Sequence, residues 1–118
     1  YVRPVIAALK SSGLHGLAHI TGGGLTENLP RALPEGLRAK IDLNSFPHLP
    51  LFDWLISKGG LSETEALKTF NCGIGMVLIV ADDSVEAIEA ALSSEGQASY
   101  RIGSLTTGNG IVYSGSIL

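Results

Sequence analysis

A chain of 118 residues with a hydrophobic fraction of 45% and a charged fraction of 16% has room for one domain with one core. Its net charge of −3, with eight lysine and arginine residues placed singly, argues against a nucleic-acid-binding surface. No apolar run approaches the ~20 residues that cross a bilayer, and no signal peptide is recognisable, so a cytoplasmic protein is expected. The first residue is Tyr1, so we do not expect it to be a natural translation start.

The first half of the chain is predicted to interleave helices and strands. Helical spacing indicates an amphipathic first helix with an apolar stripe formed by Val2, Val5, Ile6 and Leu9. In chain order the expected elements are a helix at Val2–Ser12, a buried strand at Leu14–Ile20, a short helix at Glu27–Leu33, a strand at Arg38–Leu43 and a helix at Leu51–Lys58. Trp54 lies within the last of these helices and is expected in the core or in an interface.

Two capping boxes predict where helices begin in the second half, one at Ser62–Glu65 and one at Asp83–Glu86. The helix that begins at the Ser62–Glu65 box is expected to continue through Lys68. The helix that begins at the Asp83–Glu86 box is expected to run to about Ser93 and to bury Val85, Ile88 and Leu92.

Three strands are predicted around these helices. Gly73–Ala81 is rich in valine, isoleucine and leucine, which favours a central position in its sheet. Ser99–Leu105 and Ile111–Ile117 are expected to pair as a hairpin through the turn at Thr107–Gly110. Because helices and strands are interspersed without strict alternation, the fold class is predicted as α/β (α+β), a single domain over 1–118 with helices packed on a mixed sheet.

A glycine-rich segment from His19 to Asn28 is the first candidate site. Gly22, Gly23 and Gly24 are consecutive, so their backbone N–H groups lack neighbouring Cβ atoms and could converge on an anion such as phosphate. A helix that begins near Thr26 would add its positive end, and a threonine hydroxyl could donate a further hydrogen bond. The spacing alone leaves a plain tight turn equally open.

A second candidate segment runs from Thr69 to Met76. Glycines at alternate positions leave one face of the strand entry bare, so that a ligand or another backbone can approach closely. Asn71 could offer a donor and an acceptor to such a ligand, whereas a β-bulge or tight helix packing would explain the same glycines. Cys72 is expected to be a small buried hydrophobe, since no histidine pattern supports a nucleophile.

No metal site is predicted from the sequence. His15 and His19 are four residues apart in a predicted strand, where that spacing corresponds to roughly 13 Å and is too long for one ion. The carboxylates are explained by helix caps and solvated helix faces, so no catalytic residue is assigned.

Taken together, the motifs resemble the C-terminal domain of aminoimidazole ribonucleotide (AIR) synthetases in content and in order. The T-G-G-G element is shared by a wider superfamily that includes selenophosphate synthetases, thiamine-phosphate kinases and hydrogenase maturation proteins. The E-N-L-P-R and T-F-N-C-G-I-G-M strings point to the cyclo-ligase itself. The segments that carry the resemblance are His19–Arg31, Leu33–Pro34, Trp54–Leu55 and Thr69–Met76.

The resemblance implies a three-layer α/β/α domain, partly ferredoxin-like, that packs on an N-terminal domain missing from this chain. The whole enzyme would be a homodimer that uses ATP and Mg²⁺ to close the imidazole ring of formylglycinamidine ribonucleotide in purine biosynthesis. Its active site would lie between the two domains, so this chain alone would be inactive and would expose an apolar patch. Two alternatives remain: a stand-alone module that binds a phosphorylated metabolite, and another superfamily member such as a selenophosphate synthetase.

The residues expected to contact substrate or phosphate combine both segments. The glycine loop would supply backbone donors, Asn71 and Gly73 would lie beside it, and His19 is a weaker candidate. The full set is His19, Thr21, Gly22, Gly23, Gly24, Asn71 and Gly73.

Overall fold

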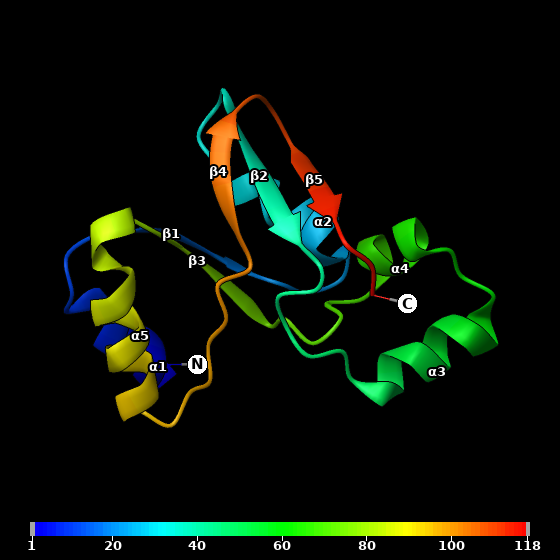
Figure 1. The fold of residues 1–118 in the computed structure, drawn as a ribbon, viewed down its shortest axis with the longest axis horizontal. Helices are drawn as coiled ribbons and strands as arrows, with labels where there is room; N and C mark the ends of the chain where they lie inside the picture. The colour runs from blue at the N-terminus through cyan, green and yellow to red at the C-terminus, as the bar shows by residue number, and fades with distance from the viewer. Residues whose placement is uncertain (1, 118) are drawn as a thin grey trace. The chain divides into compact units, whose positions relative to one another are not determined.

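The computed structural model describes residues 2–117, which divide into two compact units (Figure 1). The first unit comprises residues up to 17 together with 78–100, and the second comprises 18–77 together with 101 onwards. Strands β1 (Leu14–His19) and β3 (Met76–Val80) pair with each other, and each contributes residues to both units. No helix within residues 2–117 is long and apolar enough to span a membrane.

The first unit is built on two helices, α1 (Val2–Leu9) and α5 (Val85–Ser94). Its small core consists of Ala8, Ile88 and Leu92, against which Leu14, Leu78 and Val80 pack. The predicted burial of Ile88 and Leu92 is therefore confirmed, and Val85 is half-buried. The predicted first helix is formed as α1, but the residue that it buries in this core is Ala8, and Val2, Ile6 and Leu9 of the apolar stripe are exposed.

The start of α5 differs from the predicted capping box at Asp83–Glu86. A short 3₁₀ turn (Asp82–Ser84) precedes the helix, and the N-cap residue is Ser84, whose side chain makes no capping hydrogen bond. Ser84 has helical backbone angles, φ −107° and ψ −3°, whereas a capping side chain normally acts from the extended region. The Ser84 hydroxyl bonds the Asp83 carboxylate instead, at 3.3 Å.

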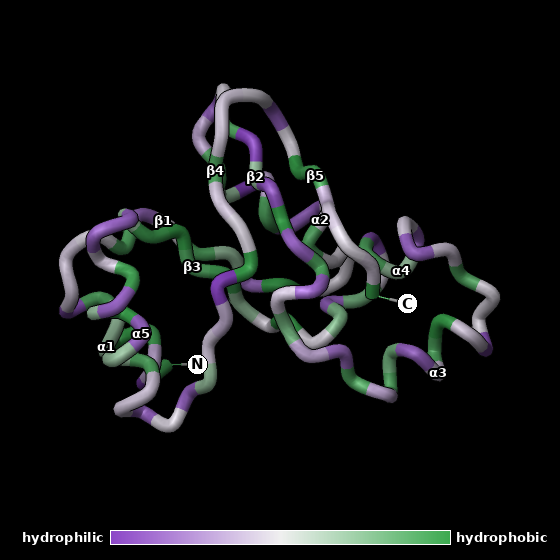
Figure 2. Tube along the Cα trace, in the orientation of Figure 1, coloured by the Kyte–Doolittle hydropathy of each residue, from purple (hydrophilic) through white to green (hydrophobic). Residues whose placement is uncertain are grey.

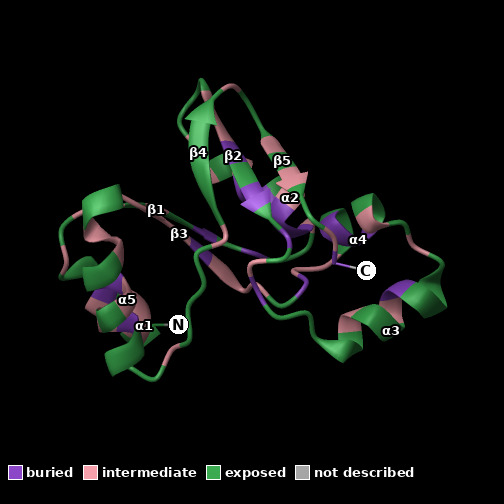
Figure 3. Ribbon diagram, in the orientation of Figure 1, coloured by how far each residue is buried: buried purple, intermediate pink, exposed green. Residues whose placement is uncertain are grey.

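The second unit contains a three-stranded mixed sheet in the order β4-β2-β5. The central strand β2 (Leu37–Asp42) pairs antiparallel with β4 (Gly103–Thr107) and parallel with β5 (Ile111–Ser114). The mixed sheet is thus confirmed, and the α/β fold class with it. Figure 3 shows that β4 is exposed along its length, whereas β2 alternates towards the core.

The predicted hairpin between β4 and β5 is wrong, because the two strands lie on opposite sides of β2. The connecting loop crosses the beginning of β2 and bonds to that end of the sheet. Gly108 N–H donates to the Gly36 carbonyl at 3.0 Å, and Gly110 O accepts from Ala39 N–H at 3.0 Å. The glycines serve this crossing, since Gly108 and Gly110 have φ of 144° and 72°.

The most apolar strand, predicted as Gly73–Ala81 and central, is also corrected. It begins at Met76 as β3 and belongs to a two-stranded sheet with β1. β3 is hydrophobic along its whole length (Figure 2). Its residues divide between two cores: Val77 lies in the core of the second unit, and Leu78 and Val80 pack on that of the first. A strand that serves two cores needs apolar residues at consecutive positions without being central.

The helices of the second unit pack around its core. α2 (Gly24–Asn28) begins earlier than the predicted helix at Glu27–Leu33, and Pro30 opens a separate 3₁₀ turn (Pro30–Ala32). α3 (Pro50–Gly59) buries Ile56, but Trp54 is 57% exposed and not in the core. The buried members are Ala18, Ile20, Leu25, Leu29, Ala39, Ile41, Leu43, Phe46, Ile56, Ala66, Leu67, Cys72, Val77 and Ile117.

The capping box at the start of α4 (Glu63–Thr69) is confirmed. Ser62 Oγ accepts from Glu65 N–H at 3.2 Å, and Ser62 N–H donates to Glu65 Oε2 at 3.3 Å. We expect Ser62→Ala to lower the free energy of unfolding by about 1 kcal/mol in urea denaturation, because a helix N–H loses its acceptor. Thr64→Ala, an exposed change in the same turn, is the control, and equal effects of the two changes would contradict the capping role.

Candidate functional site

The glycine loop leaves the end of β1 through a tight turn. Ile20 is buried, with 2% of its surface exposed, and the chain reaches the surface at Thr21 and Gly22. Gly24 N–H donates to the Thr21 carbonyl at 2.9 Å, which closes the turn. Gly23 and Gly24 have φ of 99° and 61°, a region that favours glycine.

The three glycines have different physical reasons to be there. A Cβ on Gly24 would meet the backbone carbonyl oxygens of Leu67 and Phe70, so glycine is what lets α2 approach α4. A Cβ on Gly23 would meet the Glu27 side chain. A Cβ on Gly22 would meet nothing within 4 Å, and Gly22 does not have the positive φ of its neighbours. Packing and backbone strain therefore explain Gly23 and Gly24 but not Gly22.

The donors of the loop are the N–H groups of Gly22 and Gly23. Neither has a hydrogen-bond partner within residues 2–117, whereas the N–H of Gly24 is already bonded to Thr21. The Thr21 side chain is exposed, but the Thr26 hydroxyl is bonded to the Tyr113 hydroxyl at 2.8 Å. The helix that follows has only five residues, so the loop itself and not a helix dipole carries any attraction for an anion.

The Thr26 contact ties α2 to β5. Burial raises the pKa of Tyr113, the hydrogen bond from Thr26 opposes this rise, and the neighbouring Cys72 adds to it. Tyr113 therefore stays a neutral phenol at physiological pH and can donate to or accept from the threonine hydroxyl.

The second segment, Asn71–Gly75, also forms a tight turn. Gly73 N–H donates to Asn71 Oδ1 at 2.9 Å, and Ile74 N–H donates to the Asn71 carbonyl at 3.0 Å. Cys72 and Gly73 have φ of 54° and 96°. The Asn71 oxygen and the Gly73 N–H thus satisfy each other, and the Asn71 amide nitrogen is the group that remains for a ligand.

The fold brings the two predicted segments together although about 50 residues of chain separate them. Ile20 N–H donates to the Gly75 carbonyl at 2.9 Å, directly before the glycine loop and directly after the Asn71 turn. Gly24 lies against the Phe70 carbonyl on the other side of that turn. His19 is exposed at the end of β1.

Cys72 is held in the core as expected. Its side chain is 4% exposed, and its thiol lies 3.8 Å from the Ala66 carbonyl oxygen and 3.7 Å from that of Phe70. Burial raises the pKa of the Cys72 thiol from 9.0 to about 11. Both features make the sulfur a weak nucleophile.

We expect native Cys72 to react with iodoacetamide at pH 8 at least roughly a hundredfold more slowly than in urea, because the raised pKa leaves far less thiolate. Because the folded pKa lies above the unfolded one, folding favours the neutral thiol. Its contribution to stability is present below pH 9.0 and is lost as the pH rises towards about 11. Equal rates of alkylation in the native and unfolded chain would contradict this assignment.

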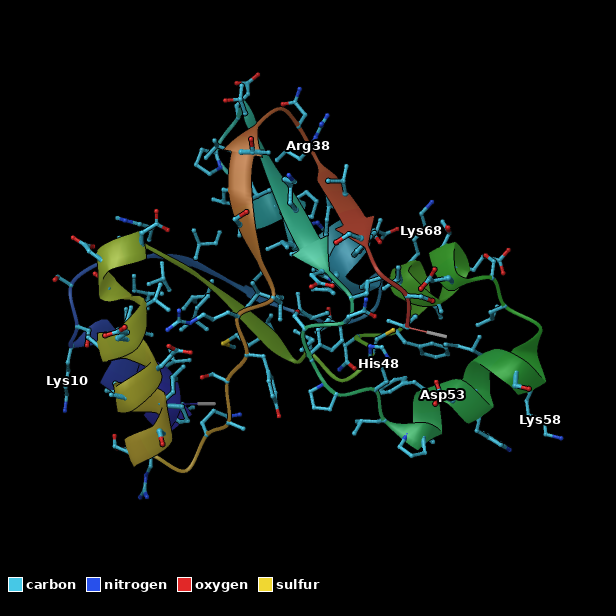
Figure 4. The ribbon with its side chains drawn as sticks, viewed as in Figure 1. Lys10, Arg38, His48, Asp53, Lys58 and Lys68 are labelled. Carbon is cyan, nitrogen blue, oxygen red and sulfur yellow. The ribbon has the colours of Figure 1, made fainter. Side chains whose placement is uncertain are left out.

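A small open pocket beside Cys72 brings together residue types that could suggest a catalytic triad. His48 and Asp53, both labelled in Figure 4, line it with Cys72. However, the thiol faces backbone carbonyls, and His48 Nε2 bonds the Leu43 carbonyl at 2.6 Å. No nucleophile–base hydrogen bond therefore exists among these described residues.

Magnesium is implied by the family resemblance. Within residues 2–117 no group of three or more His, Cys, Asp or Glu side chains is placed to hold a metal ion.

Sequence reasoning missed Asn28, which organises the glycine loop. Its side chain is 8% exposed and donates to the carbonyl oxygens of Thr21, Gly22 and Gly24 at 3.3, 3.3 and 2.8 Å. The sequence did offer a signal: Asn28 lies in a short predicted helix directly after the glycines, and asparagine side chains commonly form hydrogen bonds with nearby backbone groups.

Several solved structures contain the same fold as one part of a longer chain. Escherichia coli HypE, a hydrogenase maturation protein, matches with a TM-score of 0.72 and 24% identity over 95% of this chain and 35% of its own. The protein tt0281 from Thermus thermophilus matches with a TM-score of 0.67 and 23% identity over 98% of this chain and 36% of its own. Thiamine-monophosphate kinase from Stenotrophomonas maltophilia matches with a TM-score of 0.66 and 18% identity over 91% of this chain and 33% of its own. This chain spans about a third of the length of these proteins.

The fold is therefore that of a domain found within larger proteins. The chain belongs to the family described as AIR synthase related protein, C-terminal domain, whose model matches residues 1–115.

Proposed function

We propose that this chain is the C-terminal domain of an AIR synthetase, the ATP-dependent cyclo-ligase that converts formylglycinamidine ribonucleotide to aminoimidazole ribonucleotide. Membership of the family supports the general class. The particular enzyme is supported by the strings that resemble cyclo-ligases, E-N-L-P-R within His19–Arg31 and T-F-N-C-G-I-G-M at Thr69–Met76.

The observation that carries the proposal is the meeting in space of the two segments that contain these strings, at Ile20 with Gly75 and at Gly24 with Phe70. The turn at Asn71–Gly75 adjoins the glycine loop, where the N–H groups of Gly22 and Gly23 lack protein partners within residues 2–117. Backbone donors without partners, with no Cβ above them, suit the oxygens of a phosphate group.

In this proposal each residue of the site has a distinct part. Gly22 and Gly23 donate backbone N–H groups to a phosphate of the substrate or of ATP, and the Thr21 hydroxyl can add a donor. Asn71 offers its amide nitrogen beside them. Gly24 and Gly73 shape the two turns, and the exposed His19 is a weaker contact.

The remainder of the enzyme lies outside this chain in the proposal. An N-terminal domain would provide the acidic ligands for Mg²⁺ and the rest of the ATP site, the whole protein would act as a cytoplasmic homodimer, and the isolated domain would be inactive.

Another member of the superfamily is the alternative. The structural matches to HypE and to thiamine-monophosphate kinase, at 24% and 18% identity, reflect the fold alone and do not select an activity. A non-catalytic module that binds a phosphorylated metabolite would use the same loop.

The experiment is a panel of activity assays on the longer protein that we propose carries this domain. With ATP and Mg²⁺ it should convert formylglycinamidine ribonucleotide to aminoimidazole ribonucleotide, and it should not use selenide or thiamine monophosphate. Turnover of either of these instead would reassign the enzyme within the superfamily. Binding of ribonucleotide without turnover of any of the three would favour the binding module.

A further inference from the structure

One buried side chain, together with the backbone hydrogen bond from Gly24 N–H to the Thr21 carbonyl, determines which way the peptide groups of the glycine loop point. Asn28 is the buried polar residue among residues 2–117, and its amide group makes three contacts, all to backbone carbonyls of this loop. Its two N–H groups serve the oxygens of Thr21, Gly22 and Gly24. A buried amide without these acceptors would be costly, so the contacts hold the loop in one arrangement.

The direction of these carbonyls fixes the direction of the neighbouring N–H groups. In a planar trans peptide the C=O of one residue and the N–H of the next point in opposite directions. Since the Thr21 and Gly22 oxygens face Asn28, the N–H groups of Gly22 and Gly23 must point away from it. These are the two N–H groups that lack a partner within residues 2–117.

We infer that Asn28 is a positioning residue that makes the loop selective for anions. Asn28 binds the carbonyl oxygens on the inner side of the loop, so the N–H donors face outward. Outward N–H donors attract phosphate oxygens, whereas outward carbonyl oxygens would repel them. Within residues 2–117 the Gly22 carbonyl has no partner other than Asn28, whereas the Thr21 carbonyl also accepts from Gly24 N–H. Without Asn28 the peptide between Gly22 and Gly23 can therefore rotate, because glycine restricts it little, and its carbonyl oxygen then reaches the surface. This inference rests on the proposed phosphate-binding role of the loop, and it assigns to Asn28 the polarity of that site.

The test uses inorganic phosphate as the probe and isotope-labelled chain observed by NMR. In the unmodified chain the amide resonances of Gly22 and Gly23 should shift on addition of phosphate, and their amide hydrogens should exchange rapidly with solvent. Asn28→Ala removes the donor, and Asn28→Asp keeps the shape but presents a carboxylate that only accepts. Both variants should bind phosphate at least about tenfold more weakly, and both should move the two glycine resonances even without phosphate.

Ile41→Val is the matched control, because Ile41 is 4% exposed in the same core and lies in β2. It should cost stability and leave phosphate affinity and the glycine resonances unchanged, which separates positioning from a general loss of stability. Folded Asn28→Ala with unaltered phosphate affinity would overturn the inference and leave the phosphate site standing. Slow exchange of the Gly22 and Gly23 amides in the unmodified chain would overturn the inference without any variant. A lack of phosphate-induced shifts in the unmodified chain would overturn the site and the inference together.

Discussion

Replacing Gly24 with alanine is expected to lower the free energy of unfolding by about 3 kcal/mol or more. The new Cβ would meet the backbone oxygens of Leu67 and Phe70, which belong to α4 and its C-terminal end and have no rotamer through which to withdraw. The φ of 61° adds a further penalty for a residue with a side chain. Urea denaturation followed by circular dichroism measures the change.

Gly22→Ala is the matched control for Gly24→Ala. It lies two residues earlier in the same loop, and its Cβ would meet nothing within 4 Å. We expect a change of less than about 0.5 kcal/mol. If both substitutions cost the same, the account of α2 packing on α4 through Gly24 is wrong.

Leu25→Ala is expected to destabilise the chain by about 3 kcal/mol. Leu25 is 1% exposed, so truncation removes apolar contacts and leaves a cavity in the core of the second unit. Leu51→Ala, at a position that is 59% exposed in α3, should change stability by less than about 0.5 kcal/mol. A small effect of Leu25→Ala in the same denaturation experiment would mean that α2 is not anchored in this core.

Some local signals in the sequence predicted local structure, although the capping box at Asp83–Glu86 did not form. The capping box at Ser62 is formed, and helix α3 and strand β2 lie within one residue or so of their expected ranges. Helix capping and apolar periodicity act between residues that are close together in the chain, so they depend little on the rest of the fold.

Several expectations that depended on long-range placement failed. A hairpin signal at Thr107–Gly110 could not reveal that β2 lies between the two strands, since any tight glycine turn permits either path. The apolar run of β3 indicated a central strand because periodicity does not distinguish one buried sheet from two separate cores. Trp54 is 57% exposed, so it is not in the core, and its alternative place in an interface stays a prediction.

Part of the candidate site followed from the sequence and part did not. The glycine segment and the Asn71 turn were both recognised, but nothing in the spacing showed that Ile20 and Gly75 bond to each other. The three glycines looked equivalent, and only their surroundings show that Gly22 lacks a packing role. Asn28 was overlooked because its three acceptors are backbone oxygens, which leave no mark in the sequence.

The surroundings of the three glycines decide which substitution tests ligand binding by the loop. Gly23→Ala would affect folding as well as ligand binding, because Gly23 has a φ of 99° and a Cβ there would meet the Glu27 side chain. Gly22 is free of both problems, so we expect a larger side chain there to hinder access to the N–H groups of Gly22 and Gly23 without disturbing the core. Gly59→Ala, in α3 and distant in sequence from the loop, is a suitable control.

The most direct measurement is isothermal titration of formylglycinamidine ribonucleotide and of ATP, separately, into the longer protein that carries this domain. Our account predicts that at least one of them binds and that Gly22→Val weakens its affinity by about tenfold or more, while Gly59→Ala leaves it unchanged. If neither ligand binds, or if a folded Gly22→Val protein binds both as tightly as the unmodified one, the loop is only a turn. In that case the proposed phosphate site is wrong.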